Sequence, residues 1–378
     1  MIFYVFLVIV LVFFVAERRI YVSMWNRGLT YECHFSTEEA FEGDEIELIE
    51  TVTNNKWLPI PWAKTEISTS RWLEYAGSQS TVTDQTRFVP SFFVLKSHHR
   101  VVRRWRVKCL RRGVFGVGKI IVVATDLFGR ETLSMPVPVH AEVTVLPKPL
   151  ETEAAALTPS GLCGETVVRR RLIADPFYVS GVREYTPFDS ANRIHWPATA
   201  RAGRIMVRSN DCTADQTVTV LLNMQTRRDE ARLRHDEEDI EQGIRAAATC
   251  LAQAAEQGIP MKLLANGGMP GKTPTATRQG SGEDFFFDEL RVLARLENEK
   301  SENLQPFLNT LGRDALSTDV YLITPYWEDT MEDFARQQSF AGVQVHFILT
   351  RPLDTDELPP ECSISYFLPV RTGEEGAA

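Results

Sequence analysis

The stretch Gln216-Thr-Val-Thr-Val-Leu-Leu222 is, after Gln216, a continuous run of apolar and β-branched residues. Such runs are typical of strands that are buried on both faces of a parallel sheet. The segment from Asp236 to Gln257 then places apolar residues at helical spacing, until Gly258 and Pro260 end it. Because a strand followed by a helix is the repeating unit of parallel sheets, the stretch predicts an α/β domain.

The downstream residues repeat this alternation. Further strands are predicted at Met261–Ala265, Asp319–Thr324 and Val343–Leu349, and further helices at Phe287–Glu297 and Thr330–Phe340. Elements that alternate in this way form right-handed crossovers around a parallel-type central sheet. We therefore expect an α/β domain over residues 213–370, with a polar, mobile loop from Asn266 to Glu283 and a disordered tail at 371–378.

Residues 28–146 show the pattern of β structure instead. Within Glu45-Ile-Glu-Leu-Ile-Glu-Thr-Val-Thr53, the apolar residues Ile46, Leu48 and Val52 share one face, with acidic or hydroxyl residues between them. Short strands separated by turn signals, with few helical stretches, predict a β-sandwich. The expected fold class is therefore multidomain α+β, with a β-sandwich before the α/β domain.

Proline and small residues mark the segments that we do not expect in regular strands. Pro59 and Pro61 exclude a helix where they stand, and they suit an edge strand or a loop. Residues 147–165 combine Pro, Ala, Ser and Gly without an apolar period, which is typical of a linker. A basic and aromatic segment, residues 166–212, then joins the two predicted domains.

The N-terminal residues Met1 to Ala16 contain no charge, glycine or proline. We interpret 1–23 as a transmembrane anchor, although this run is slightly shorter than a typical span of about 17–25 residues. A cleaved signal peptide would need a basic residue before the apolar run, and none is present. Arg18, Arg19 and Arg27 follow the run, so the positive-inside tendency predicts a single-pass protein with its soluble part in the cytoplasm.

Composition and motifs argue against several kinds of chemistry. The net charge of −9 argues against nucleic-acid binding, which usually goes with a basic balance. The six cysteines are scattered without a Cys-x-x-Cys pair, so neither a metal cluster nor a disulfide framework is indicated. The motifs of zinc proteases, serine hydrolases and dinucleotide-binding domains are missing from the sequence. We therefore predict no enzyme, no catalytic residue, no cofactor and no bound metal.

The loop after the first strand of the predicted α/β domain corresponds in position to a known cation site. In open α/β sheets, ligands bind beyond the carboxyl ends of the strands. The von Willebrand factor A fold holds Mg²⁺ there through an Asp-x-Ser-x-Ser loop after its first strand. The corresponding positions are Asn223, Gln225 and Arg227, which supply no carboxylate and no serine. The loop is thus a degenerate metal site. If it nevertheless binds the cation, the chain is a magnesium-dependent adhesion or ligand-binding module, which is an alternative to the function inferred below.

The segment from Ser180 to Arg204 combines arginines with aromatic residues. Arginine forks suit carboxylate or phosphate partners, and Trp faces suit arginine stacking. The binding or interface candidates are Arg183, Tyr185, Asp189, Arg193, Trp196 and Arg201. They form either a structural clasp between the domains or a partner-binding surface. A hydrolase that works through Glu184, Asp189 and His195 is a third possibility.

The same segment resembles the bacterial family called domain of unknown function 58. Its hallmark reads roughly Gly-x-Arg-x-Tyr-x-x-Gly-Asp-x-x-Arg-x-Ile-x-Trp-x-Ala-x-Ala-Arg-x-Gly. Phe188 stands where the family has glycine, and Cys109–Gly118 and Asp126–Gly129 also look like the family's sandwich end. The matching positions are Gly181, Arg183, Tyr185, Asp189, Arg193, Ile194, Trp196, Ala198, Ala200, Arg201 and Gly203.

The resemblance implies membrane spans, a sandwich and a von Willebrand factor A-like domain. Family members are often encoded beside MoxR-type AAA+ ATPases and transglutaminase-like membrane proteins. This implies an adaptor role in envelope-related assembly at a bacterial inner or cell membrane, with a MoxR-like ATPase as the protein partner. We expect the strand-end loops 223–230, 266–284 and 325–330 to face that partner.

Overall fold

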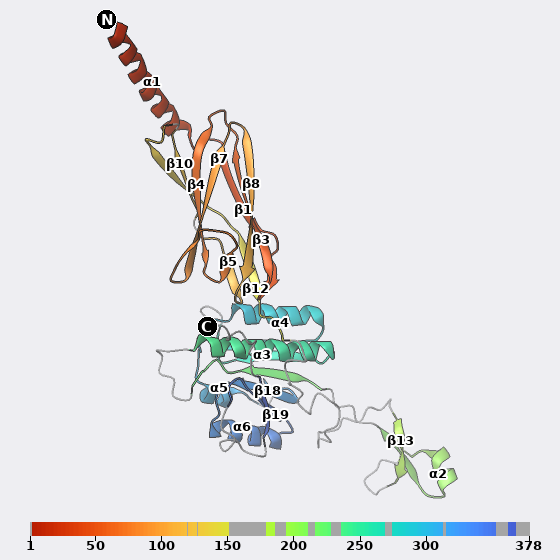
Figure 1. Cartoon of the computed structure of the whole chain (residues 1–378). Helices are drawn as coiled ribbons and strands as arrows, with labels where there is room; N and C mark the ends of the chain where they lie inside the picture. The colour runs from red at the N-terminus through yellow and green to blue at the C-terminus, as the bar shows by residue number, and fades with distance from the viewer. Residues whose placement is uncertain are drawn as a thin grey trace, which may run out of the picture. The chain divides into compact units, whose positions relative to one another are not determined.

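A computed structural model describes ten stretches of the chain (Figure 1). These are residues 2–118, 120–126, 128–150, 179–185, 194–210, 216–227, 236–268, 274–312, 315–352 and 362–367. Most of the predicted linker and the tail at 371–378 lie outside them. The chain divides into one unit of Met1–Pro149 with Phe287–Leu296, and a second of Leu150–Phe286 with Glu297–Ala378.

The first unit contains the N-terminal helix α1 (Ile2–Met24) and an antiparallel β-sandwich. One sheet has the order β1-β3-β8-β5, a second has β11-β10-β4-β7-β6, and a small third has β2-β12-β9. The strands are β1 Leu29–Phe35, β2 Glu39–Phe41, β3 Glu45–Asn54, β4 Ile60–Ser70, β5 Leu73–Tyr75, β6 Thr81–Thr83, β7 Thr86–Leu95, β8 His99–Cys109, β9 Gly113–Gly116, β10 Ile120–Thr125, β11 Thr132–Val137 and β12 Glu142–Leu146. The predicted sandwich is confirmed.

The inner faces of these strands form one hydrophobic core. On β3, Ile46, Leu48 and Val52 are all buried, as their period-two spacing predicts. The expectation for Pro61 as an edge or loop residue is wrong in one respect, because β4 is an interior strand between β10 and β7. The ladder between β4 and β7 shifts register between Ile60 and Ala63, and this bulge accommodates the missing N–H of Pro61.

The second unit is built on a mostly parallel sheet. Its strand order is β17-β16-β15-β18-β19-β20, and β17 alone runs antiparallel to its neighbour among the described strands. The strands are β15 Val218–Leu222, β16 Met261–Ala265, β17 Thr275–Ala276, β18 Asp319–Thr324, β19 Gln344–Leu349 and β20 Ser363–Tyr366. The helices of this unit are α3 Glu237–Glu256, α5 Leu304–Thr310 and α6 Asp329–Phe340. Helix α4, Glu283–Arg295, belongs from Phe287 onward to the first unit. The predicted α/β architecture is confirmed.

Helices cover both faces of this sheet. A Cβ atom on Gly243 of α3 would lie 3.1 Å from Leu222, so α3 lies directly on that face of β15. Leu221 instead shares a hydrophobic cluster with Phe307 of α5 and Phe334 of α6. Because successive residues of a strand point to opposite faces, α3 and the pair α5–α6 lie on opposite sides.

Part of the predicted mobile loop from Asn266 to Glu283 is regular structure. Residues of β17 pair with β16, and Gly280 forms a bridge with Met261. This part of the chain therefore extends the sheet instead of forming a surface loop, because its backbone groups complete the ladder at the β16 edge. The remainder, residues 269–273, lies outside the described residues.

The N-terminal segment is helical, as its composition predicts. Within the described part of the chain, no helix combines the length and the apolar character that crossing a membrane requires.

A hairpin outside the sheet carries the family motif. Strand β13 (Val179–Glu184) pairs antiparallel with β14 (Met206–Asn210), and the short helix α2 (Trp196–Ala202) lies between them in sequence. The hairpin thus holds the two ends of the motif side by side.

Candidate functional site

The carboxyl ends of three neighbouring strands carry buried polar side chains. Asn223 follows β15, Asn266 follows β16 and Thr324 ends β18, and none is more than 4% exposed. Asn223 Nδ2 donates to Thr324 Oγ1 at 3.1 Å, and Asn266 Nδ2 donates to Asn223 Oδ1 at 3.1 Å. Neutral groups therefore bond one another across the strand ends.

Gln225 ties the loop after β15 into the same set. The backbone N–H of Gln225 donates to Asn223 Oδ1 at 3.0 Å. Gln225 Nε2 donates to the carbonyl of Arg227 at 2.7 Å, and its Oε1 accepts from the backbone N–H of Leu304 at 3.1 Å. We call Asn223, Gln225, Asn266 and Thr324 the strand-end network.

The strand-end network lies where a sheet of this order binds ligands. Counted along the chain from β15, the strand order is 3-2-1-4-5-6, and the direction of winding reverses between β15 and β18. A hard cation there would require carboxylate oxygens, whereas the network consists of amides and a hydroxyl group that already bond one another. No group of three or more His, Cys, Asp or Glu side chains that could hold a metal was found among the described residues.

Charged residues occupy the next strand end. Arg351, which follows β19, donates from Nε to Asp239 Oδ1 at 2.6 Å and from Nη2 to Asp236 Oδ2 at 2.7 Å. Both aspartates lie at the N-terminus of α3, where a negative charge is favourable. Burial raises the pKa of Asp239, although the guanidinium of Arg351 opposes this shift. These three side chains therefore fix the start of α3 to the sheet.

The structure brings together only part of the predicted loop and motif residues. Asn223 and Gln225 belong to the strand-end network, while the side chain of Arg227 is exposed. On the hairpin, Tyr185 and Trp196 are 37% and 69% exposed, and Arg201 is also exposed. Arg183 lies on β13. Asp189 and Arg193 lie outside the described residues.

Several motif residues shape helix α2. His195 is the N-cap residue, and its Nδ1 accepts a hydrogen bond from the backbone N–H of Ala198 at 3.1 Å. Pro197 occupies the first turn, where its missing N–H has no cost. Gly203 has φ +69° and closes the helix with a bond from its N–H to the carbonyl of Thr199 at 2.9 Å. His195 thus has a capping role.

The run Cys109–Gly118 contacts helix α4 within the first unit. Arg112 is 5% exposed, and its Nη1 donates to the carbonyls of Leu293, Ala294 and Leu296 at 2.8, 3.3 and 2.9 Å. Leu293 and Ala294 lie in the last turn of α4 and Leu296 directly follows it, so Arg112 supplies donors where the helix runs out of its own. The neighbouring Arg111 instead lies over the ring of Trp72, with 4.7 Å from its guanidinium carbon to the ring centroid.

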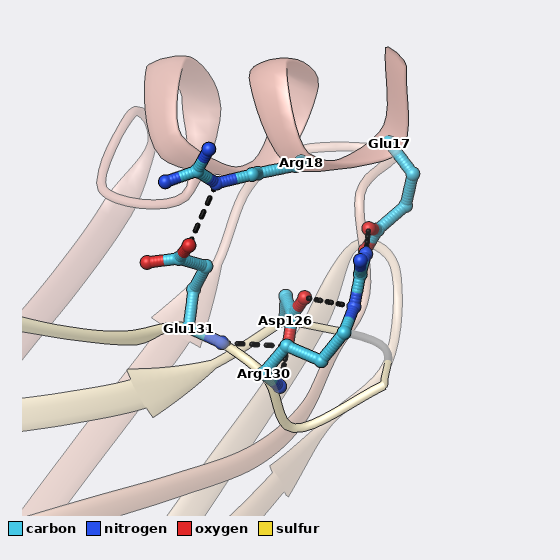
Figure 2. A network of polar contacts seen from close by, with 5 residues as sticks. All are labelled: Glu17, Arg18, Asp126, Arg130 and Glu131. Atoms are coloured by element: carbon cyan, nitrogen blue, oxygen red, sulfur yellow. Dashed lines mark hydrogen bonds and ion pairs between the residues drawn. The ribbon is translucent and has the colours of Figure 1, made fainter. Parts of the chain in front are cut away.

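Ion pairs join α1 to the sandwich (Figure 2). Arg130 Nη2 donates to Glu17 Oε2 at 2.9 Å, and Arg18 Nε donates to Glu131 Oε1 at 2.6 Å. Asp126 Oδ1 accepts from the backbone N–H groups of Arg130 and Glu131 at 2.6 and 3.2 Å, which fixes the loop between β10 and β11. We call Glu17, Arg18, Arg130 and Glu131 the helix clasp.

Aromatic and backbone contacts extend the helix clasp. The ring centroids of Phe14 and Phe128 lie 5.0 Å apart, and the guanidinium carbon of Arg130 lies 4.7 Å from the Phe14 centroid. At the C-terminal end of α1, Lys56 Nζ donates to the carbonyl of Trp25 at 2.6 Å. Burial lowers the pKa of Lys56 to about 8. The base of α1 is therefore held at several points.

The sequence interpretation missed Asn266 and Arg351. Each stands at the carboxyl end of a strand that was predicted correctly, or within two residues of it. Because the carboxyl ends of parallel strands meet at one edge of a sheet, the residue after each predicted strand is the signal that could have identified them.

The family comparison concerns the hairpin and most of the α/β sheet. Residues 181–346 match the family described as "Protein of unknown function DUF58". The chain carries a DUF58 domain. This confirms the resemblance that the motif residues indicated. The DUF58 domain begins in β13 and ends in β19, so it includes the positions of the strand-end network. A comparison with curated proteins finds no match.

Part of the chain is also similar to solved cohesin structures. A non-cellulosomal cohesin from Archaeoglobus fulgidus is 11% identical and has a TM-score of 0.22, covering 31% of this chain and 91% of that one. A cohesin from Clostridium thermocellum in a cohesin–dockerin complex is 14% identical, with a TM-score of 0.22 and coverages of 31% and 99%. The sixth cohesin of scaffoldin B from Acetivibrio cellulolyticus is 12% identical, with a TM-score of 0.22 and coverages of 30% and 98%. Scores this low support no conclusion about function.

Proposed function

We propose that this chain is a membrane-attached, non-enzymatic protein-interaction protein that acts as an adaptor for a MoxR-type AAA+ ATPase in envelope-related assembly. The observation that carries the proposal is the strand-end network. Asn223, Asn266 and Thr324 satisfy one another, so this edge offers neutral amides and a hydroxyl where an enzyme would need a poised acid–base pair. The strand order also supports relating this domain to the von Willebrand factor A fold.

The proposed membrane attachment is supported by α1. Its apolar side chains are exposed on all sides of the helix: Phe3 and Tyr4 are each 71% exposed, Leu11 62% and Phe13 57%. A helix that is hydrophobic all round needs an apolar environment, and a bilayer supplies one. The proposal places the protein at a bacterial inner or cell membrane. Arg18, Arg19 and Arg27 favour a cytoplasmic position for the folded part.

The proposed partner surface includes the hairpin. Trp196 and Tyr185 are exposed aromatic side chains, and residues of this kind dominate the binding energy of many protein interfaces. Exposed Arg201, on the same hairpin, would suit carboxylates of a partner.

Affinity capture of the tagged full-length chain from its own solubilised membranes tests the proposal. We expect an AAA+ ATPase to be recovered in stoichiometric amounts and to be lost from a variant with Tyr185→Ser and Trp196→Ser. Phe340→Ser is the matched control, because it removes an aromatic residue that is 89% exposed on α6. Recovery of no stoichiometric partner, with or without ATP and Mg²⁺, would overturn the adaptor role.

A magnesium-dependent ligand-binding module is the second candidate, since the degenerate loop lies at the switch point of the sheet. We expect a calorimetric Mg²⁺ titration of the full chain to give no saturable binding below millimolar concentration, because Asn223 and Gln225 supply no carboxylate. Saturable micromolar binding that is lost in Asn223→Ala but kept in Arg227→Ala would favour the second candidate instead.

A further inference from the structure

One end of the sandwich gathers loops around the base of α1 (Figure 1). The hydroxyl of Tyr21, on α1, donates to the carbonyl of Pro59. The backbone N–H of His98 donates to the carbonyl of Lys56 at 3.1 Å, which joins the β7–β8 turn to the loop that holds Pro59. The helix clasp adds the loop that holds Arg130. We call this end, with the three loops, the helix end.

Aromatic side chains are exposed at the helix end and on the adjoining sheet face. Trp57 is 59% exposed, Phe128 51%, Phe92 50% and Trp62 38%. The rings of Trp62 on β4 and Phe92 on β7 lie 6.0 Å apart, and the ring of Phe128 lies 6.5 Å from that of Phe13 on α1. Phe128 therefore continues the apolar surface of α1 onto the sandwich.

Positive charge accompanies these rings. The side chains of Arg19, Arg27 and Lys96 are exposed at the base of α1 and in the β7–β8 turn. The carboxylates of Glu17 and Glu131 are engaged in the helix clasp by arginines. The helix end thus presents exposed cations and aromatic rings beside an apolar helix.

We propose that the helix end of the sandwich lies in the headgroup layer of a membrane rich in anionic phospholipid. Trp57 and Phe128 would enter the interface between headgroups and acyl chains, while Arg19, Arg27 and Lys96 would contact lipid phosphates. This arrangement rests on the proposed membrane attachment by α1 and extends it to the folded part of the chain. The amphipathic ring of Trp57 favours this interfacial depth, and each cation near an anionic surface adds attraction.

The helix clasp makes this position possible. A helix joined by a loose linker would let the sandwich move freely above the surface. Here Arg130, on the sandwich, forms an ion pair with Glu17 of α1 and lies over the ring of Phe14 on the same helix. Helix α1 and the sandwich therefore move as one body. Once α1 enters a bilayer, the helix end must follow it to the surface.

A second copy of the chain or a soluble protein could also cover exposed aromatic residues. We favour lipid because the aromatic surface continues onto α1, which is apolar on all sides, and because exposed cations border it. An interface with a protein partner usually has an apolar core surrounded by a polar rim. Binding of such a partner would not depend on the charge of the lipid.

Quenching of tryptophan fluorescence by brominated lipids tests the proposal. The full-length chain is reconstituted in vesicles of brominated phosphatidylcholine, with and without phosphatidylglycerol. We expect a share of the quenching to be lost in Trp57→Phe and to be kept in Trp72→Phe, whose ring lies beside β5 near the far end of β8. In anionic vesicles this Trp57-dependent share should increase, and Arg27→Gln with Lys96→Gln should abolish that increase.

The charge control is Arg106→Gln with Lys108→Gln, which removes two exposed cations from the far end of β8. It should keep the increase in anionic vesicles. Failure of the wild-type chain to associate with any vesicle would overturn both the membrane attachment and this surface. Association without Trp57-dependent quenching, or an equal effect of both charge variants, would overturn the surface alone and point to a protein on this face.

Discussion

Replacing Glu50 with alanine is expected to lower the free energy of unfolding of the sandwich by about 3–5 kcal/mol, because it leaves buried donors without their acceptor. Glu50, on β3, is 0% exposed. Its Oε1 accepts hydrogen bonds from Tyr31 Oη at 2.8 Å and Thr65 Oγ1 at 2.6 Å, and its Oε2 accepts one from Ser91 Oγ at 2.8 Å. Tyr31 lies in the same sheet, whereas Thr65 and Ser91 lie in the facing one, so this carboxylate joins the two sheets.

Two further groups support the charge of Glu50. Trp105 Nε1 lies 3.3 Å from Oε2, and Arg103 Nη1 donates to Ser91 Oγ at 2.5 Å. The same charge acts on its neighbours: burial, and then the charge of Glu50, raise the pKa of the Cys33 thiol to about 12. Loss of the carboxylate therefore removes the hydrogen-bond acceptor that donors from several strands share.

Urea unfolding monitored by tryptophan fluorescence measures the effect. Glu50→Gln keeps one oxygen acceptor and the side-chain volume, so its loss should be smaller, about 1–3 kcal/mol. The matched control is Glu47→Ala on the same strand. Glu47 forms a half-exposed pair with Arg104 at 3.1 Å, and pairs of this kind contribute about 0–1 kcal/mol. If Glu50→Ala and Glu47→Ala destabilise equally, the network does not hold the sheets together.

Glu50 also shows what period-two patterning can and cannot predict. The pattern placed Ile46, Leu48 and Val52 on the inner face, and the parity of Glu50 is the same as theirs. We read the acidic residues of this strand as lying between the inward ones, which is wrong for Glu50. Burial of Glu50 is tolerable because Tyr31, Thr65 and other residues on distant strands donate hydrogen bonds to it. No local sequence pattern reveals these donors.

The α/β sheet was predictable because its signals are local. Met261–Ala265 and Asp319–Thr324 are strands with the predicted boundaries, since buried parallel strands are continuous apolar runs. The candidate site was predictable only in part. Comparison with an Asp-x-Ser-x-Ser loop identified Asn223 and Gln225, but their partners Asn266 and Thr324 are set by the order of strands in space. That order is not contained in any short stretch of sequence.

Helix α4 depends on a residue of the sandwich. Arg112 follows β8 and donates to three carbonyls at the end of α4, at Leu293, Ala294 and Leu296. On the same helix, Arg291 Nε and Nη2 donate to Glu39 Oε1 and Oε2 at 2.6 and 3.1 Å. The Arg291 pair is part-exposed, so it contributes little, whereas Arg112 is buried.

Replacing Arg112 with alanine should therefore cost about 2–3 kcal/mol, because charge-assisted hydrogen bonds to buried carbonyls are lost together. Hydrogen exchange should show the amides of α4 losing protection, with those of β3 unchanged. Lys at position 112 restores the charge but not the planar fork, so Arg112→Lys should recover only part of the loss. The matched control is Arg111→Ala, which removes a cation over Trp72 and should leave the protection of α4 unchanged. Equal loss of α4 protection in both alanine variants would mean that positive charge in this turn, and not the cap formed by Arg112, holds the helix.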